Sequence, residues 1–120
     1  SLAELMDLYP TLSELAGLSI PEETQGRSLT SVLKNSNANV RSGALSVGKK
    51  GYALRTTDWA YIRYQDATEE LYNMRIDPGQ FTNLALSADQ GKHLAQLREQ
   101  LSAKLNANGL QLRKQGKKKD

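Results

Sequence analysis

Few side chains in this 120-residue sequence could carry out hydrolysis. A hydrolase needs a nucleophile beside a base, or a metal-bound water, and both require clusters of His, Asp or Glu. The one histidine, His93, lies between Lys92 and Gln96 in a helical pattern typical of an exposed surface. Cysteine is absent, which excludes disulfides, thiolate catalysis and cysteine-ligated metals. With no Gly-rich phosphate loop, His-x-x-x-His pair or Gly-x-Ser-x-Gly elbow, the residues alone predict no complete enzyme.

Two other groups of side chains invite a chemical interpretation. Glu69 and Glu70 are adjacent, and on a strand they would point to opposite faces, so they cannot act as an acid/base pair on one atom. We interpret them as a solvated strand end. Five aromatic residues could form a stacking platform for sugars or bases, but at a period of two in strands they favour core packing. These are Tyr52, Trp59, Tyr61, Tyr64 and Tyr72.

Residues 113–120 concentrate positive charge, with five Lys or Arg and one Asp, which leaves the rest of the chain close to neutral. Such a run could attract a polyanion by counterion release. No aromatic residue is interleaved to give specificity, so the pattern favours a basic disordered tail.

The elements that would position these groups begin with a helix. Apolar residues recur every three or four positions between Leu5 and Ala16, and the pattern stops at Gly17, which suits the end of a helix. With Asp7 as the N-cap, Pro10 falls in the first turn, where it is tolerated; a start further upstream would put a kink at Pro10. A short helix is expected near 28–34, and the turn-forming residues 35–43 predict a surface linker.

From Ala44 the period changes to two. Residues 44–47, 52–56, 59–64 and 70–74 are rich in β-branched and aromatic side chains and predict an antiparallel meander. Asp77-Pro78-Gly79 predicts a tight turn in which Gly79 takes a positive φ. Ser87 and Gln90 have the spacing of a capping box, and they open a long helix that ends near Gly109. Its apolar stripe consists of Leu94, Leu97, Leu101 and Leu105.

The expected fold class is therefore α+β, with an antiparallel three- to four-stranded sheet packed by a long C-terminal helix and preceded by a short helical segment. The expected divisions are a helical segment at 1–34, a linker at 35–43, a sheet-plus-helix domain at 44–112 and the basic tail at 113–120. No apolar run approaches the ~20 residues needed to cross a bilayer. The first residues carry no positively charged leader, so the start looks cut rather than natural.

Three stretches together resemble the C-terminal part of sulfatases, the alkaline-phosphatase-like hydrolases that use a formylglycine nucleophile. Residues 7–12 and 15–18 look like the family's Asp-Leu-x-Pro-Thr-Leu helix ending in Ala-Gly, and residues 25–29 like its Gly-Arg-Ser-Leu segment. Residues 70–73, 77–78 and 83–85 are similar to the Glu-Leu-Tyr-Asp, Asp-Pro-x-Glu and Asn-Leu-Ala signature, with Asn73 and Gln80 as departures. Residues 51–56 resemble a strand of the iduronate-2-sulfatase branch, although Ala60 stands where a basic residue often precedes the Tyr.

The resemblance implies a partner: a large α/β catalytic domain, absent here, that holds the formylglycine and a calcium ion. Neither cofactor is expected in this chain, because Ser19-Ile20-Pro21 lacks the Arg of the nucleophile motif and the resemblance implies that the calcium ligands lie far upstream. The resemblance also implies an anionic sulfated substrate, such as a glycan, and a periplasmic, secreted or lysosomal location. It does not favour a membrane or nucleic acid as a partner.

The residues best placed to meet such a substrate are cationic. Lys49 and Lys50 fall on a hairpin tip and Arg55 on the strand that follows, although hairpin-tip lysines commonly serve solubility. Two other functions stay open. The chain could be a stand-alone module that binds sulfated glycan or nucleic acid, or a purely structural dimerisation domain.

Overall fold

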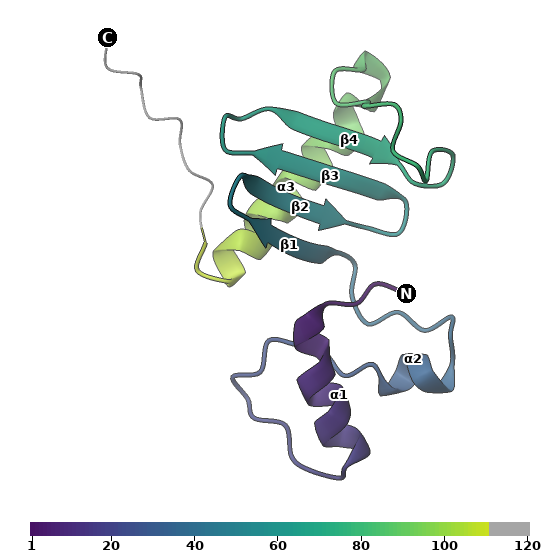
Figure 1. The fold of residues 1–120 in the computed structure, drawn as a ribbon, viewed down its shortest axis with the longest axis vertical. Helices are drawn as coiled ribbons and strands as arrows, with labels where there is room; N and C mark the ends of the chain where they lie inside the picture. Colours follow the sequence, from purple (N-terminus) through teal and green to yellow (C-terminus); the bar gives the residue numbers. More distant parts are fainter. Residues whose placement is uncertain (111–120) are drawn as a thin grey trace. The chain divides into compact units, whose positions relative to one another are not determined.

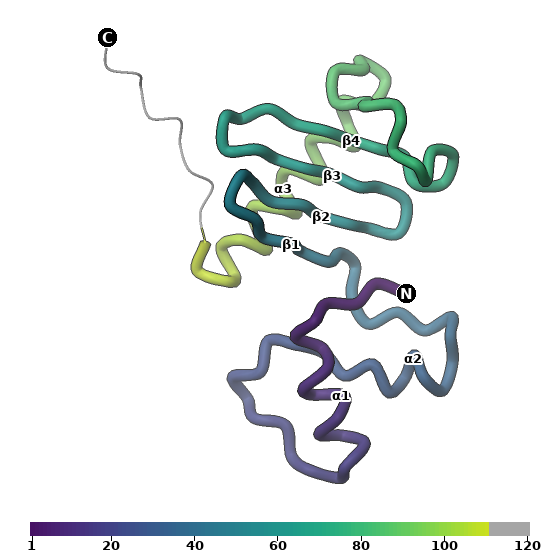
Figure 2. The backbone as a smooth tube through the Cα atoms, in the orientation of Figure 1, coloured from purple at the N-terminus to yellow at the C-terminus, as the bar shows by residue number. Residues whose placement is uncertain are grey.

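The computed structural model describes residues 1–110, so the predicted tail at 113–120 lies outside the described residues. The chain divides into two compact units, Ser1–Ala44 and a second that begins at Leu45 (Figures 1 and 2). The first unit contains a 3₁₀ turn, η1 (Leu5–Asp7), and two helices, α1 (Leu8–Leu15) and α2 (Thr30–Lys34). The predicted linker, 35–43, thus lies within the first unit.

Helix α1 begins and ends where its sequence predicts. Asp7 is the N-cap residue, which places Pro10 in the first turn, where its missing N–H is not needed. After the helix, Gly17 takes a positive φ of 72°. The N–H of Gly17 donates to the Glu14 carbonyl at 3.1 Å, and that of Leu18 donates to the Ser13 carbonyl at 2.9 Å. These two bonds form a Schellman motif, which a residue with a side chain would form only with strain.

The face of α1 that is buried is its polar face. Pro10, Thr11 and Ser13 are buried, together with Asp7 just before the helix. The apolar stripe predicted from the leucine spacing is present, but its side chains are exposed: Leu12 keeps 63% of its surface and Leu15 keeps 62%. The first unit is therefore held together mainly by polar contacts.

The Asp7 carboxylate is the centre of these contacts. Its Oδ1 accepts the backbone N–H of Arg27 at 2.8 Å and a bond from the Arg41 guanidinium, while its Oδ2 accepts the N–H of Glu4 at 2.8 Å. Arg41 also forms an ion pair with Glu4 at 3.0 Å. Burial alone would raise the pKa of Asp7, but these donors outweigh it and hold the pKa below its usual value.

A second tie joins α1 to the segment 26–30. The Thr11 hydroxyl donates to the Asp7 carbonyl at 2.6 Å and accepts the backbone N–H of Leu29 at 2.8 Å. Gly26 passes so close that a Cβ there would lie 1.9 Å from the Met6 carbonyl oxygen. The motifs at 7–12 and 25–29 are therefore two halves of one contact, and Gly26 permits their approach.

The second unit contains the predicted antiparallel meander, here with four strands in the order β1-β2-β3-β4. The strands are β1 (Ala44–Gly48), β2 (Gly51–Arg55), β3 (Trp59–Tyr64) and β4 (Glu69–Asn73). Leu54 lies opposite Tyr61, and Tyr61 lies opposite Leu71, so these three side chains share one face. Helix α3 (Gly91–Ala107) crosses this face, and its four predicted leucines complete the core (Figure 1). The predicted α+β fold is confirmed.

The start of α3 differs from the prediction. Ser87 precedes a 3₁₀ turn, η2 (Ala88–Gln90), and no side chain caps it, so the predicted capping box is wrong. The α-helix itself starts at Gly91, directly after this turn, which forms the first hydrogen bonds of the helical segment. Its end is as predicted, with Gly109 at a φ of 69°.

The turn after β4 is also present, with one change. The N–H of Gln80 donates to the Asp77 carbonyl at 3.0 Å, but the positive φ, 58°, belongs to Gln80 and not to Gly79. The Asp77 carboxylate explains this placement, because it accepts the N–H groups of Phe81 and Thr82 at 3.0 and 2.9 Å. Those bonds turn the chain at Gln80.

Replacing Asp7 by Asn should lower the free energy of unfolding by about 3 kcal/mol at pH 7, because the buried Arg41 guanidinium loses its anion. The lowered pKa means that Asp7 stabilises the fold above its unfolded pKa of about 4, and that this contribution is lost as the pH falls through the folded value. Urea unfolding at pH 7 and pH 3 measures both effects. Glu22→Gln, which removes an exposed carboxylate, is the control and should cost under about 0.5 kcal/mol. Equal losses for the two variants would contradict the role of Asp7.

Candidate functional site

The predicted substrate-binding lysines occupy the tip of the β1–β2 hairpin. Lys49 and Lys50 are the two residues between the strands, and both are exposed. Their backbone is fixed by Gln65, whose N–H donates to the Lys50 carbonyl at 2.9 Å and whose side-chain amide donates to the Lys49 carbonyl. Within residues 1–110 neither ammonium group has a hydrogen-bond or ion-pair partner, so both can meet an anion.

A shallow, open depression adjoins this tip. It is lined by residues of the hairpin and by Ile62 and Tyr64 of β3. Its lining combines apolar and aromatic residues, such as Val47, Tyr52, Ile62 and Tyr64, with Lys49 and Lys50. Such a surface suits a ring with one apolar face and an anionic substituent.

Arg55, the third predicted residue, lies away from the lysines. It ends β2, five residues from Lys50, and a strand of that length spans roughly 17 Å. The structure therefore does not bring the three cations to one point. The Nη1 atom of Arg55 is buried and has no hydrogen-bond partner among the described residues.

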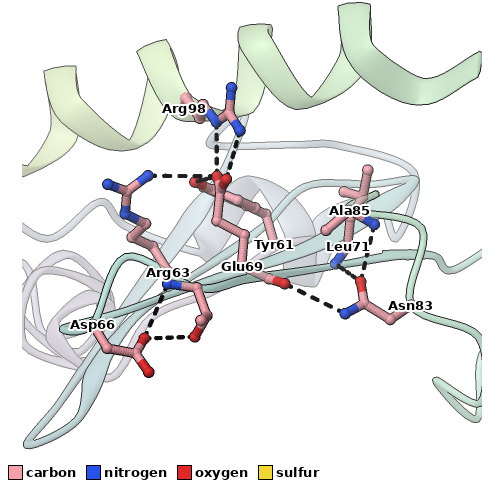
Figure 3. A network of polar contacts seen from close by, with 9 residues as sticks. Tyr61, Arg63, Asp66, Glu69, Leu71, Asn83, Ala85 and Arg98 are labelled. Carbon is pink, nitrogen blue, oxygen red and sulfur yellow. Dashed lines mark hydrogen bonds and ion pairs between the residues drawn. The ribbon is translucent and has the colours of Figure 1, made fainter. Parts of the chain in front are cut away.

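Glu69 ties the sheet to the long helix (Figure 3). Arg98 of α3 donates to it through Nε at 2.7 Å and through Nη2 at 2.5 Å, a bidentate arrangement. The Tyr61 hydroxyl donates to the same carboxylate at 2.5 Å, and Arg63 lies 3.6 Å from it. Only 12% of the Glu69 side chain is exposed, so its interpretation as part of a solvated strand end is wrong.

The protonation behaviour of this cluster follows from its contacts. The hydrogen bonds from Arg98, and then from Tyr61, lower the pKa of Glu69, against the opposing effect of burial. Burial, followed by the bond to Glu69, raises the pKa of Tyr61 to about 12. Because these shifts keep Glu69 ionised and Tyr61 neutral near pH 7, the cluster is a structural tie rather than a proton-transfer site.

Glu70 points to the opposite face of the sheet, as the alternation predicts. The Tyr72 hydroxyl donates to its carboxylate at 2.6 Å, and the Tyr64 hydroxyl donates to the other oxygen. The hydrogen bonds from Tyr64 and Tyr72 lower the pKa of Glu70. The bond between Tyr72 and Glu70 also raises the pKa of Tyr72 to about 12. Glu69 and Glu70 therefore cannot share a substrate atom.

Asn83 replaces a missing strand neighbour at the edge of β4. Its Oδ1 accepts the N–H groups of Leu71 and Ala85, each at 3.0 Å, and its Nδ2 donates to the Glu69 carbonyl at 3.3 Å (Figure 3). The N–H of Leu84 donates to the Leu71 carbonyl at 2.7 Å. The signature residues at 70–73 and 83–85 are therefore a strand edge and the loop that covers it.

Other features point to structure rather than chemistry. The imidazole of His93 is exposed and stacks on Trp59, with ring centroids 4.9 Å apart. Across residues 1–110 no group of three or more His, Cys, Asp or Glu side chains could hold a metal ion. In the same range, no helix has the length and apolar character needed to cross a membrane.

The sequence interpretation missed three residues that organise the structure. Arg41 was assigned to a surface linker, yet only 7% of it is exposed. Its signal was weak, a lone cation among Asn, Ser and Gly. Arg98 was not singled out, because it lies outside the apolar stripe of the predicted helix. Asn83 was noted within a motif, but its spacing to β4 gave no hint that its amide would bond to the strand.

Comparison with known proteins identifies the class. Residues 1–108 match the family model described as "N-sulphoglucosamine sulphohydrolase, C-terminal". The fold and this match define the C-terminal region of a sulfatase, and the chain belongs to that family. The predicted resemblance is thereby confirmed.

Individual relatives agree with this assignment. The chain is 38% identical over 103 residues to a Δ4,5-hexuronate-2-O-sulfatase of Bacteroides thetaiotaomicron, covering 78% of this chain and 21% of that protein. It is 31% identical over 101 residues to mouse (Mus musculus) arylsulfatase K, covering 71% of this chain and 18% of that protein. A solved 2-O GAG sulfatase superposes with a TM-score of 0.76 at 31% identity, over 86% of this chain and 24% of that one. The chain thus spans about a fifth of the length of these curated relatives.

Replacing Glu69 by Gln should lower the free energy of unfolding by about 1–2 kcal/mol, because Arg98 and Arg63 lose their shared anion. The matched control is Asp58→Asn, which breaks an exposed ion pair to Arg75 and should cost under about 0.5 kcal/mol. Chemical denaturation of the three proteins gives the comparison. Similar costs at both positions would show that the tie contributes no more than a surface pair.

Replacing Arg55 by Met should raise the free energy of unfolding by about 1 kcal/mol, because it removes a buried N–H that has no partner among residues 1–110. The same replacement at Arg63, which pairs with Glu69, should lower it. Thermal denaturation of this chain distinguishes the two variants. A loss of stability in Arg55→Met would mean that the guanidinium contributes more through its contacts than its unpaired donor costs.

Proposed function

We propose that this chain is the C-terminal part of a longer sulfuric-ester hydrolase, where it supports the catalytic part and contributes Lys49 and Lys50 to the rim of the substrate pocket. The observation that carries the proposal is the family match over residues 1–108, because its motif residues are those that tie each unit together. Catalysis itself would come from the rest of the protein. Calcium and formylglycine, which the family resemblance implies, would also belong there.

The substrate we propose is an anionic, sulfated sugar. One solved relative, at 28% identity and a TM-score of 0.71, is described in complex with D-glucosamine-2-N,6-O-disulfate. Among residues 1–110, the ammonium groups of Lys49 and Lys50 have no partner and lie beside apolar and aromatic lining residues, so they could hold the sulfate and the ring of such a ligand. Arg55 would meet a different anionic group, because it lies at the other end of β2.

Location and subfamily remain finer proposals. A periplasmic, secreted or lysosomal location rests on the family resemblance alone. The resemblance to the iduronate-2-sulfatase branch stays a prediction, since the relatives include both arylsulfatase K and a hexuronate 2-O-sulfatase. Nothing in the described residues favours the alternative, a stand-alone polyanion-binding module that would use the strand aromatics and the basic tail.

The test uses the protein expressed from its complete reading frame. It should hydrolyse a chromogenic sulfate ester, and the double variant Lys49→Ala/Lys50→Ala should raise KM for a sulfated disaccharide about 3- to 10-fold with little change in kcat. The physical reason is that exposed lysines contribute uniform electrostatic binding and touch no reacting bond.

The matched control removes two other exposed lysines, in Lys34→Ala/Lys92→Ala, and should leave KM unchanged. Equal KM values for both double variants would show that Lys49 and Lys50 do not contribute to substrate binding. Absence of sulfate-ester hydrolysis by the wild-type protein would contradict the proposed function itself.

A further inference from the structure

The end of α3 carries a chemically reactive pair of residues, Asn108-Gly109, which is the one Asn-Gly step in the sequence. An asparagine amide is thermolabile, because the backbone nitrogen of the next residue can attack its carbonyl carbon. Glycine makes this attack easiest, since it has no side chain to hinder the approach and its backbone is the most flexible. Both residues are exposed, so water can reach them.

A hydrogen-bonded cap, which we call the α3 cap, holds this pair at the end of the helix. The N–H of Gly109 donates to the Asn106 carbonyl at 3.1 Å. The N–H of Leu110 donates to the Leu105 carbonyl at 2.8 Å, and the two bonds form a Schellman motif. Leu110 also packs against the core cluster to which Leu105 belongs. The α3 cap is therefore closed by both hydrogen bonds and apolar packing.

The closed cap keeps the two reacting groups apart. The Gly109 nitrogen is engaged as a donor, and the Asn108 amide turns back along the helix, where its Nδ2 donates to the Lys104 carbonyl at 2.8 Å. The backbone of Asn108 has a ψ of 12°. Ring closure requires a ψ of roughly −120°, because tetrahedral geometry at Cα offsets Cβ by about 120° from the backbone nitrogen. The attack cannot occur in this conformation.

The attack becomes possible when the α3 cap opens. The last turn of a helix unfolds locally with a much lower free energy than the whole domain. In such an opening the Gly109 N–H loses its acceptor, and the backbone of Asn108 can rotate to other values of ψ. The rate of the reaction then depends on the fraction of time that the cap is open.

We propose that Asn108 is a site of spontaneous deamidation and that the α3 cap controls its rate. The deprotonated Gly109 nitrogen forms a bond to Cγ of Asn108, the Cγ–Nδ2 bond breaks, and Nδ2 takes up the proton and leaves as ammonia. Water then opens the five-membered succinimide at one of its two carbonyls, which gives aspartate or isoaspartate. Asparagine and water thus become an acid and ammonia, with no oxidant or enzyme. The proposal goes beyond the proposed function and does not depend on it.

Either product weakens the cap that delayed its formation. The new carboxylate lies at the negative end of the helix dipole, and the Lys104 carbonyl loses a donor. Isoaspartate also adds one carbon to the backbone, which moves Gly109 and Leu110 out of the register of the Schellman motif. Deamidation therefore leaves a frayed helix end beside the buried Leu105, and refolding does not reverse the change.

The first test follows acid formation at Asn108 by mass spectrometry of the peptide that contains it, at pH 8. The folded chain should deamidate at least about 10-fold more slowly than the same chain in guanidinium chloride, because the cap is closed in most molecules. Asn108→Gln should gain no acid at this position, because its longer side chain would have to close a larger ring. Hydrogen exchange of the Gly109 N–H should show a protection that matches the slowing of deamidation within about 3-fold, since both need the open cap.

The second test opens the cap by substitution. Leu110→Ala removes the apolar contact that closes it and should speed deamidation of the folded chain about 3-fold or more, with no change in guanidinium chloride. The control is Leu86→Ala, at a position that is 99% exposed, and it should change neither rate.

The third test copies the product. Asn108→Asp should lower the Tm by about 2–4 °C, because the carboxylate meets the helix dipole and the bond to Lys104 is lost. Asn106→Asp adds the same charge at an exposed position and keeps that bond, so it should lower the Tm less.

Four results would overturn the proposal. The first is no acid at Asn108 in guanidinium chloride, and the second is equal rates in the folded and unfolded chain. The third is a folded Leu110→Ala variant that deamidates no faster than wild type. The fourth is an Asn108→Asp variant as stable as Asn106→Asp. If Leu110→Ala does not fold, the wild-type chain decides, because a slowing that departs more than about 10-fold from the Gly109 exchange protection contradicts control by the cap.

Discussion

The buried carboxylate of Asp7 is the constraint on which the first unit depends. A carboxylate removed from water must be paired and hydrogen-bonded, and Asp7 recruits the Arg41 guanidinium and the N–H groups of Arg27 and Glu4. These donors come from three separate parts of the unit, so their convergence folds the segment around α1. It also turns the polar side of α1 inward. The leucines on the other side are then left outside.

The second unit is stabilised in a different way from the first. Its buried core joins three side chains of the sheet to the four leucines of α3, and no residue of the first unit belongs to that cluster. Polar ties stand at its margins, where Glu69 holds Arg98 and where Asn83 covers the edge of β4. The second unit can therefore be stabilised by its own apolar burial, whereas the first relies on a polar network.

The charged side chains of the second unit differ in whether they are paired within the fold, and this difference bears on function. The β1–β2 hairpin is fixed through its backbone by Gln65, so Lys49 and Lys50 are held in place while their ammonium groups have no partner within residues 1–110. Arg55 keeps a buried donor that has no partner in the described part of the chain, and this unpaired donor destabilises the fold. Residues of a binding site commonly reduce the stability of the fold, because their polar groups stay unpaired until a ligand or partner binds. The tightly paired groups, such as Glu69, are occupied with structure.

Local spacing in the sequence was enough to predict the strands, the leucine stripe of α3 and the glycine that ends α1, since each depends on neighbours along the chain. It also placed Lys49 and Lys50 at a hairpin tip. The partners of Asp7 and Glu69 could not be predicted, because Arg41 and Arg98 lie 34 and 29 residues away. The outward orientation of the α1 leucines was equally hidden. Spacing shows that a helix has two faces, but only the path of the distant chain decides which face is buried.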